Sequence, residues 1–191
     1  MTQEDLKEFK RYNDQLYQLI TSATQSYLLA RTLSDVNENE CSLDIKFIMY
    51  HEHLYIKNTV IDLYKILSNN KNERYNIFKY LNKIELNKKY FNITIEQIKA
   101  WKENIERHQS KATIITNLRS KYYAHIDSDH SEYLKIARDV ISWDDYENIF
   151  CDLQDFYIES NLILYREITG FKVSIAVEYF KSILTTFQNK L

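Results

Sequence analysis

The chain has 191 residues, of which none is proline and only one, Gly170, is glycine. An average chain of this length carries roughly ten prolines and about thirteen glycines. Because Walker and Rossmann loops and tight hairpin turns need glycine, this composition excludes both nucleotide-binding loops and disfavours a turn-rich β protein. Lys and Arg number 25 and Asp and Glu 27, so the formal net charge of −2 excludes a globally basic coat for nucleic acid but not a local basic site.

The same totals predict one domain, residues 1–191, in a reducing compartment. The chain is long enough for a single domain with a sizeable core, and no apolar run reaches the ~18–20 residues of a membrane span. The first five residues lack the basic and apolar regions of a signal peptide. Cys41 and Cys151 have no CxxC spacing and are expected to be free thiols. The sequence therefore predicts a soluble cytoplasmic protein with no contact to a membrane.

Hydrophobic periodicity predicts an all-α bundle, a single helical domain of about five long helices and one or two short ones. The first helix is expected over residues 3–31, with Thr2 as its N-cap. The second is expected over residues 43–67, and its inward face is expected to carry Phe47, Leu54, Ile61 and Tyr64. A shorter helix is expected over residues 74–84, after a polar loop.

The fourth helix is expected to be the longest, over residues 94–126. Thr94 and Gln97 fit an N-terminal capping box. One continuous seam over about eight turns is expected to consist of residues spaced by three and four, namely Ile98, Trp101, Ile105, His108, Ala112, Ile115, Arg119, Tyr122 and Ile126. An arginine in such a seam is costly unless its guanidinium meets an anion or a carboxylate.

A turn and three helices are expected after this helix. A polar turn at residues 127–131 is followed by a short helix over residues 132–138. The next long helix is expected to start at Ser142, a hydroxyl N-cap with Asp144 and Asp145 in the first turn. Gly170 is expected to end it, because glycine adopts the left-handed C′ conformation without steric penalty. A last helix is expected over residues 173–189.

The segment that best provides chemistry is residues 117–127, at the end of the longest helix. Arg119 supplies a planar fork of donors that matches phosphate oxygens, and His125 titrates near neutral pH. On a regular helix six residues correspond to about 600° of rotation and a ~9 Å rise, so the two side chains would point about 120° apart. Convergence on one ligand therefore requires the helix to end or bend near Ala124, or a second copy of the site from a partner subunit.

This segment resembles the HEPN superfamily, whose signature is an arginine followed by a histidine after four to six residues. Residues 118–127 read LRSKYYAHID, a wording most similar to the HEPN proteins grouped with bacterial abortive-infection systems. The resemblance covers residues 45–130 loosely and residues 117–127 more closely.

The resemblance implies a homodimer that brings two Arg–His motifs together as a metal-independent endoribonuclease of a phage-defence or toxin–antitoxin system. Arg119 would hold the scissile phosphate, and His125 would move a proton from the attacking 2′-hydroxyl or to the 5′-leaving oxygen. RNA supplies its own nucleophile, so no metal and no cofactor are expected. Besides RNA and the second subunit, an antitoxin or other protein is an expected partner. The supporting substrate-binding residues are expected to be Ser120, Lys121, Tyr123 and Asp127.

Two positions depart from the patterns of the superfamily. Ser120 follows the arginine where active members often have Asn, Asp or His. Asp127 stands where toxins paired with a nucleotidyltransferase antitoxin often carry Tyr. The alternative is a non-catalytic interaction or nucleotide-binding module with the same dimeric fold. In that case Arg119 pairs with an internal carboxylate and His125 caps the last carbonyls of its helix.

The remaining histidines favour structural roles. His51 and His53 are two residues apart and face opposite sides of a helix, whereas helical metal ligands are four apart, so no metal site is predicted. His108 is expected to be hydrogen-bonded in the core or in a dimer interface, and His130 to be an exposed cap residue.

Basic and aromatic residues on the motif helix leave two interpretations open. Arg107, Lys111 and Lys121 would either extend a local phosphate track or form a solvated face. Trp101 and the tyrosines near the motif would either stack on bases or belong to the core, and Tyr123 is the best candidate for stacking.

Overall fold

The computed structural model describes residues 2–36, 44–70, 72–120 and 141–165, together with residue 178 and residues 181–182. Within these ranges the regular structure is helical, which confirms the all-α class. The helices with assigned bounds are α1 (Gln3–Ser34), α2 (Ile45–Leu67), α3 (Ile77–Leu86), α4 (Lys88–Phe91), α5 (Ile95–Glu106), α6 (Gln109–Leu118) and α8 (Trp143–Tyr165). The expected elements at residues 127–131 and 132–138, the helix end at Gly170 and most of the expected helix over residues 173–189 lie outside the described residues.

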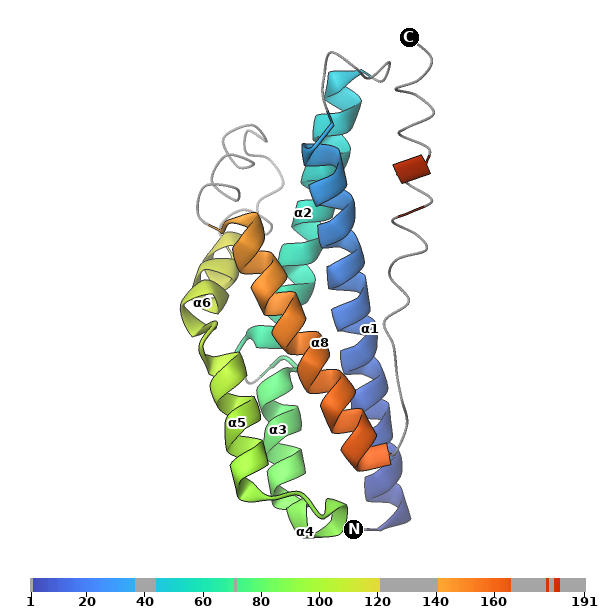
Figure 1. Cartoon of the computed structure of the whole chain (residues 1–191), viewed down its shortest axis with the longest axis vertical. Coiled ribbons are helices and arrows are strands. Elements are labelled where there is room, and N and C mark those ends of the chain that lie inside the picture. The colour runs from blue at the N-terminus through green and yellow to red at the C-terminus, as the bar shows by residue number, and fades with distance from the viewer. Residues whose placement is uncertain are drawn as a thin grey trace.

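An antiparallel hairpin of α1 and α2 forms the long axis of the molecule (Figure 1). These two helices make the most extensive contact of any described pair, and their adjoining ends project beyond α6 and α8. α8 packs on α1, while α5 packs on both α3 and α8. α6 turns back to contact α2, so the end of α6 lies against the hairpin.

Polar side chains mark the starts of the helices, as the scarcity of glycine and proline requires. The hydroxyl of Thr2 accepts from the Asp5 amide at 3.1 Å, and the Asp5 carboxylate accepts from the Thr2 amide, which completes a capping box. Thr94 and Ser142 cap α5 and α8 through their hydroxyls, so all three predicted N-caps are confirmed. Asn92, at φ 55°, supplies the left-handed residue that ends α4.

The core lies where α1, α3, α5 and α8 meet, and aromatic rings fill much of it. Tyr80 of α3 is completely buried, and its ring centroid lies 5.1 Å from Phe9 and 5.6 Å from Tyr12. Burial raises the pKa of the Tyr80 hydroxyl well above its usual value, so this group stays protonated. A chain with 16 tyrosines can therefore build its interior from them, provided that each buried hydroxyl finds a partner.

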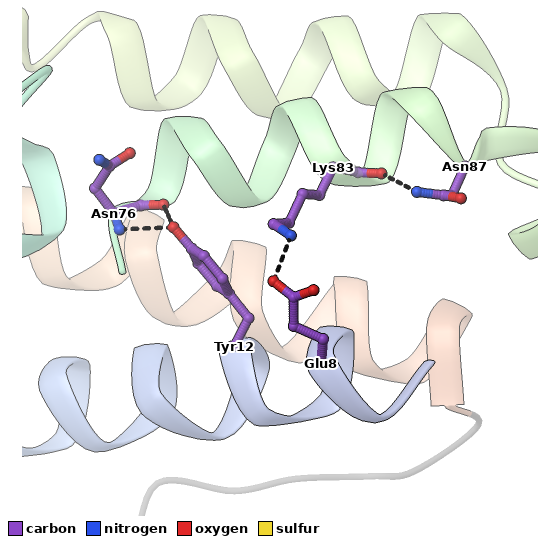
Figure 2. Close-up of polar contacts among 5 residues, drawn as sticks. All are labelled: Glu8, Tyr12, Asn76, Lys83 and Asn87. Carbon is purple, nitrogen blue, oxygen red and sulfur yellow. Dashed lines mark hydrogen bonds and ion pairs between the residues drawn. The ribbon is translucent and has the colours of Figure 1, made fainter. Parts of the chain in front are cut away.

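Tyr12 shows how such a hydroxyl sets the position of a helix (Figure 2). Its oxygen donates to the carbonyl of Asn76 and accepts from the amide of the same residue, both at 2.9 Å. Asn76 is in turn the N-cap of α3, and its side chain accepts from the Lys79 amide. One tyrosine on α1 thus fixes where α3 begins. An exposed ion pair between Glu8 and Lys83 joins the same two helices farther along.

A buried amide joins three helices. Asn13 of α1 donates to the Tyr157 hydroxyl and to the Asn161 side-chain oxygen of α8, each at 2.9 Å. Its own oxygen accepts from the Tyr80 hydroxyl of α3 at 2.7 Å. Because each bond lies in the interior, loss of the amide leaves partners that water cannot reach.

Two expectations about helix faces and lengths are wrong. Phe47 does not face inward but is 48% exposed, and Leu54 and Ile61 are only half-buried. At its projecting end α2 packs mainly on α1, so only a narrow face of the helix is buried there. That face contains Ile48, which packs beside Leu33. The predicted helix over residues 94–126 is not continuous either, because it breaks between α5 and α6 at residues 107–108.

Replacement of Asn13 by alanine is expected to lower the free energy of unfolding by about 2–4 kcal/mol, because two tyrosine hydroxyls and one amide lose their partner in the core. Urea denaturation followed by circular dichroism measures the change. The matched control is Gln18→Ala on the exposed side of α1, for which a change within about 0.5 kcal/mol is expected. Equal effects of the two substitutions would contradict the role given to the amide.

Candidate functional site

An acidic stripe on α8 holds α5 and α6 in place. Its members are seven residues apart, which puts them on one face of the helix. They are Asp145, Asp152 and Glu159. Their partners on α5 and α6, at 2.8, 2.6 and 2.6 Å, are Lys111, His108 and Trp101 respectively. The partners run in the opposite direction along the chain, as an antiparallel arrangement requires.

The central pair of this stripe coincides with the break between α5 and α6. His108 is 9% exposed and is the N-cap residue of α6, and its Nε2 contacts Oδ2 of Asp152. Arg107, the preceding residue, pairs with the same carboxylate. Since an ionised carboxylate only accepts, His108 Nε2 donates this hydrogen bond. The predicted hydrogen-bonded His108 is confirmed, and the pairing accounts for a break where the sequence pattern indicates one helix.

Arg119 lies at the other end of α6. It is the C-cap residue of that helix, and it and Ser120 have π-helical backbone. Both side chains are exposed, so the expectation that Arg119 occupies the buried seam is wrong. The buried face of α5 continues along α6 through Ala112 and Ile115, and at the end of α6 it passes through Leu118 and not through Arg119. π-helical turns often occur at functional sites.

The guanidinium of Arg119 lies over an aromatic ring. Its Cζ is 4.9 Å from the ring centroid of Tyr64, near the C-terminal end of α2. The Tyr64 ring is 7% exposed, and its hydroxyl accepts from Nδ2 of Asn70 at 3.1 Å. Within the described ranges no carboxylate forms an ion pair with Arg119. The contact that its guanidinium makes there is the cation–π contact, which does not neutralise its positive charge.

The other residues of the predicted site stand as follows. Ser120 is exposed next to Arg119. The remaining predicted site residues, which are His125, Lys121, Tyr123 and Asp127, lie outside the described residues. Their convergence with Arg119 stays a prediction.

The neighbouring basic residues are already paired. Arg107 pairs with Asp152, and Lys111 pairs with Asp145. The hydrogen bond from Lys111 lowers the pKa of the Asp145 carboxyl, with help from its bonds to Ser142. These contacts favour the structural interpretation of Arg107 and Lys111 over a phosphate track that runs along α6. Arg119 differs from both, because its described partner is an uncharged ring.

Metal-ligating and nucleophilic groups show no second site in the described ranges. No cluster of three His, Cys, Asp or Glu side chains suited to a metal ion occurs among these residues. His51 Nδ1 lies 2.9 Å from the Phe47 carbonyl on its own helix. The thiol of Cys151 is free, and partial burial together with the nearby Glu147 and Asp155 charges raises its pKa, which makes it a poor nucleophile. None of the described helices has the length and apolarity needed to cross a membrane.

A family model of HEPN proteins matches residues 6–179, which is most of the chain. The protein is thus a HEPN protein of the abortive-infection type, in agreement with its all-α fold. More narrowly, it belongs to the family described as AbiU2. No curated protein and no solved structure matches the chain significantly.

The sequence analysis did not predict two residues that matter for this site. The role of Asp152 could have been predicted, since Asp145, Asp152 and Glu159 repeat every seven residues and indicate an acidic face on that helix. Tyr64 was expected to face inward, and it does, but nothing in a single sequence links it to Arg119, which is 55 positions away. Such a contact depends on how α6 turns back onto α2.

Replacement of Asp152 by alanine is expected to lower the free energy of unfolding by about 2–3 kcal/mol, because it leaves the largely buried His108 ring without its acceptor. The matched control is Lys111→Ala, which removes a more exposed pair from the same stripe and is expected to cost less than about 1 kcal/mol. Urea denaturation at pH 7 distinguishes the two. A loss for Asp152→Ala no larger than the control's would show that the break is not held by this pair.

Proposed function

We propose that this protein is a metal-independent endoribonuclease of an abortive-infection system, with Arg119 and His125 of two subunits forming the RNA-cleaving site. The observation that carries the proposal is the state of Arg119. Its guanidinium is exposed at the end of α6, oriented by the Tyr64 ring and without a carboxylate partner in the described ranges. An arginine placed in this way is suited to bind an external anion. Membership of an abortive-infection HEPN family supports RNA as the source of that anion.

The proposed reaction uses the RNA's own 2′-hydroxyl. This oxygen attacks the adjacent phosphorus, the P–O5′ bond breaks, and the products are a 2′,3′-cyclic phosphate and a 5′-hydroxyl. Arg119 binds the non-bridging oxygens and stabilises the extra negative charge of the transition state. His125 moves a proton, either away from the 2′-hydroxyl or onto the leaving 5′-oxygen, and the histidine of the second subunit is available for the complementary step.

Ser120 and the residues after it complete the proposed site. Ser120, exposed beside Arg119, is placed to donate to the same phosphate. Lys121 supplies a positive charge near the RNA backbone, and Asp127 has a supporting role in substrate binding. Tyr123 stacks on a base. The protein acts in the cytoplasm, and an antitoxin or another protein restrains it. No cofactor enters this scheme.

The alternative is a non-catalytic HEPN module with the same dimeric fold. Ser120 favours it, because active members often have Asn, Asp or His at that position. In this case the exposed guanidinium binds a nucleotide or a partner's carboxylate without bond cleavage.

Purified protein is expected to cleave single-stranded RNA in the presence of EDTA and to leave 2′,3′-cyclic phosphate ends, detectable by mass spectrometry. His125→Ala and Arg119→Ala are each expected to lower the cleavage rate at least about a hundredfold, in line with the loss of a proton-transfer or charge-stabilising group. Lys99→Ala, at an exposed position on α5, is the control for loss of a surface charge and is expected to be active.

Arg119→Ala is also expected to keep its melting temperature within a few degrees, because an exposed cation–π contact contributes only about 0.5–1 kcal/mol. RNA binding without cleavage by the wild-type protein would favour the non-catalytic module. Cleavage at equal rates by the wild type and His125→Ala would rule out the catalytic assignment.

The two-subunit site requires a dimer. Light scattering at micromolar concentration is expected to give about 46 kDa, twice the 23.1 kDa of the chain. Mixing inactive Arg119→Ala with inactive His125→Ala is expected to restore part of the activity if the two residues act across the interface. A mass of about 23 kDa would contradict the composite site.

A further inference from the structure

We propose that Tyr64 is a positioning residue for Arg119 in RNA cleavage: its ring holds the guanidinium where the N–H donors meet the scissile phosphate. This inference rests on the proposed function. The carrying observation is that the guanidinium of an exposed side chain from α6 lies over a buried ring from α2, with Cζ 4.9 Å from the ring centroid.

The ring is a fixed support. Tyr64 lies in the last turn of α2, where Leu63 and Leu67 beside it are almost completely buried. Its hydroxyl accepts from the Asn70 side chain at 3.1 Å. Asn70 is itself held, because its Oδ1 accepts from the Asn72 amide at 2.9 Å. The Tyr64 ring is therefore held in place by the core around it, and its hydroxyl is held by the loop after α2.

The geometry separates the two functions of a guanidinium. Its N–H donors bind oxygen acceptors, whereas the cation–π contact is an electrostatic attraction to the ring that needs no acceptor. The contact with Tyr64 therefore holds Arg119 without neutralising its charge, as a carboxylate partner would, and its donors can bind phosphate oxygens. A ring that restrains the long arginine side chain before RNA arrives also reduces the conformational entropy lost on binding.

The location at the junction of α6 and α2 gives the contact a second role. Arg119 is the C-cap residue of α6, a helix of ten residues. Tyr64 belongs to the long hairpin of α1 and α2. The contact with this ring thus holds the proposed catalytic arginine against the hairpin.

The test compares Tyr64→Phe with Tyr64→Leu in the full-length protein. Phenylalanine keeps the ring and loses only the hydroxyl, so kcat for RNA cleavage is expected to stay within about threefold of the wild type. Leucine fills the apolar space but removes the ring, and kcat is expected to fall about ten- to a hundredfold with a smaller change in KM, as for a misplaced catalytic group. In an Arg119→Ala background, Tyr64→Leu is expected to have no further effect.

A structural readout accompanies the kinetics. Nuclear magnetic resonance of ¹⁵N-arginine-labelled protein reports the Arg119 Nε–Hε signal, assigned by its loss in Arg119→Lys. The ring current of Tyr64 is expected to shift this signal, and the shift is expected to persist in Tyr64→Phe and to vanish in Tyr64→Leu. Circular dichroism checks that both variants are folded. If Tyr64→Leu does not fold, the Arg119 signal in Tyr64→Phe and the kcat of Asn70→Ala test the positioning role instead.

Asn70→Ala removes the anchor of the hydroxyl without touching the ring, so kcat is expected to fall no more than in Tyr64→Phe. Active wild-type protein in which Tyr64→Leu retains full kcat would overturn the positioning role alone. Wild-type protein that does not cleave RNA would overturn the proposed function, and the positioning role with it.

Discussion

The contact between His108 and Asp152 determines how the described part of the molecule is arranged. It lies where α5 ends and α6 begins, and it binds that break to the middle of α8. Together with the contacts of Asp145 and Glu159, it ties α5 and α6 to α8. α6 in turn contacts α2, and at its end Arg119 lies exposed over Tyr64. The arginine proposed to act on RNA thus belongs to a helix that is held on one side by α8 and contacts α2 as well.

The sequence predicted those parts of the fold that depend on neighbouring residues. The all-α class, the N-caps at Thr2, Thr94 and Ser142, and a hydrogen-bonded His108 all follow from local patterns, and the structure confirms them. Periodicity could not reveal the break, since Ile105, His108 and Ala112 keep their spacing of three and four across it and all remain buried. A seam drawn on one ideal helix therefore placed Arg119 inside when it lies outside.

The same distinction applies to the candidate site. Arg119 was recognisable because its residue type and its spacing from His125 match a known signature, which requires no three-dimensional information. Its environment depends on tertiary packing, and the ring beneath it belongs to another helix. Membership of the AbiU2 family places the chain among abortive-infection HEPN proteins. The geometry adds that the described surroundings of Arg119 orient it without neutralising its charge.

The buried amide of Asn13 has a consequence for how this protein can vary. Its donor and acceptor groups are matched at once to Tyr80, Tyr157 and Asn161 on two other helices. A change at any one of these four positions leaves polar groups stranded at the others, whereas apolar neighbours such as Leu16 tolerate substitution by side chains of similar volume. We therefore expect a substitution at one of these four positions to be tolerated only when its partners change with it, so that the point where α1, α3 and α8 meet behaves as one unit.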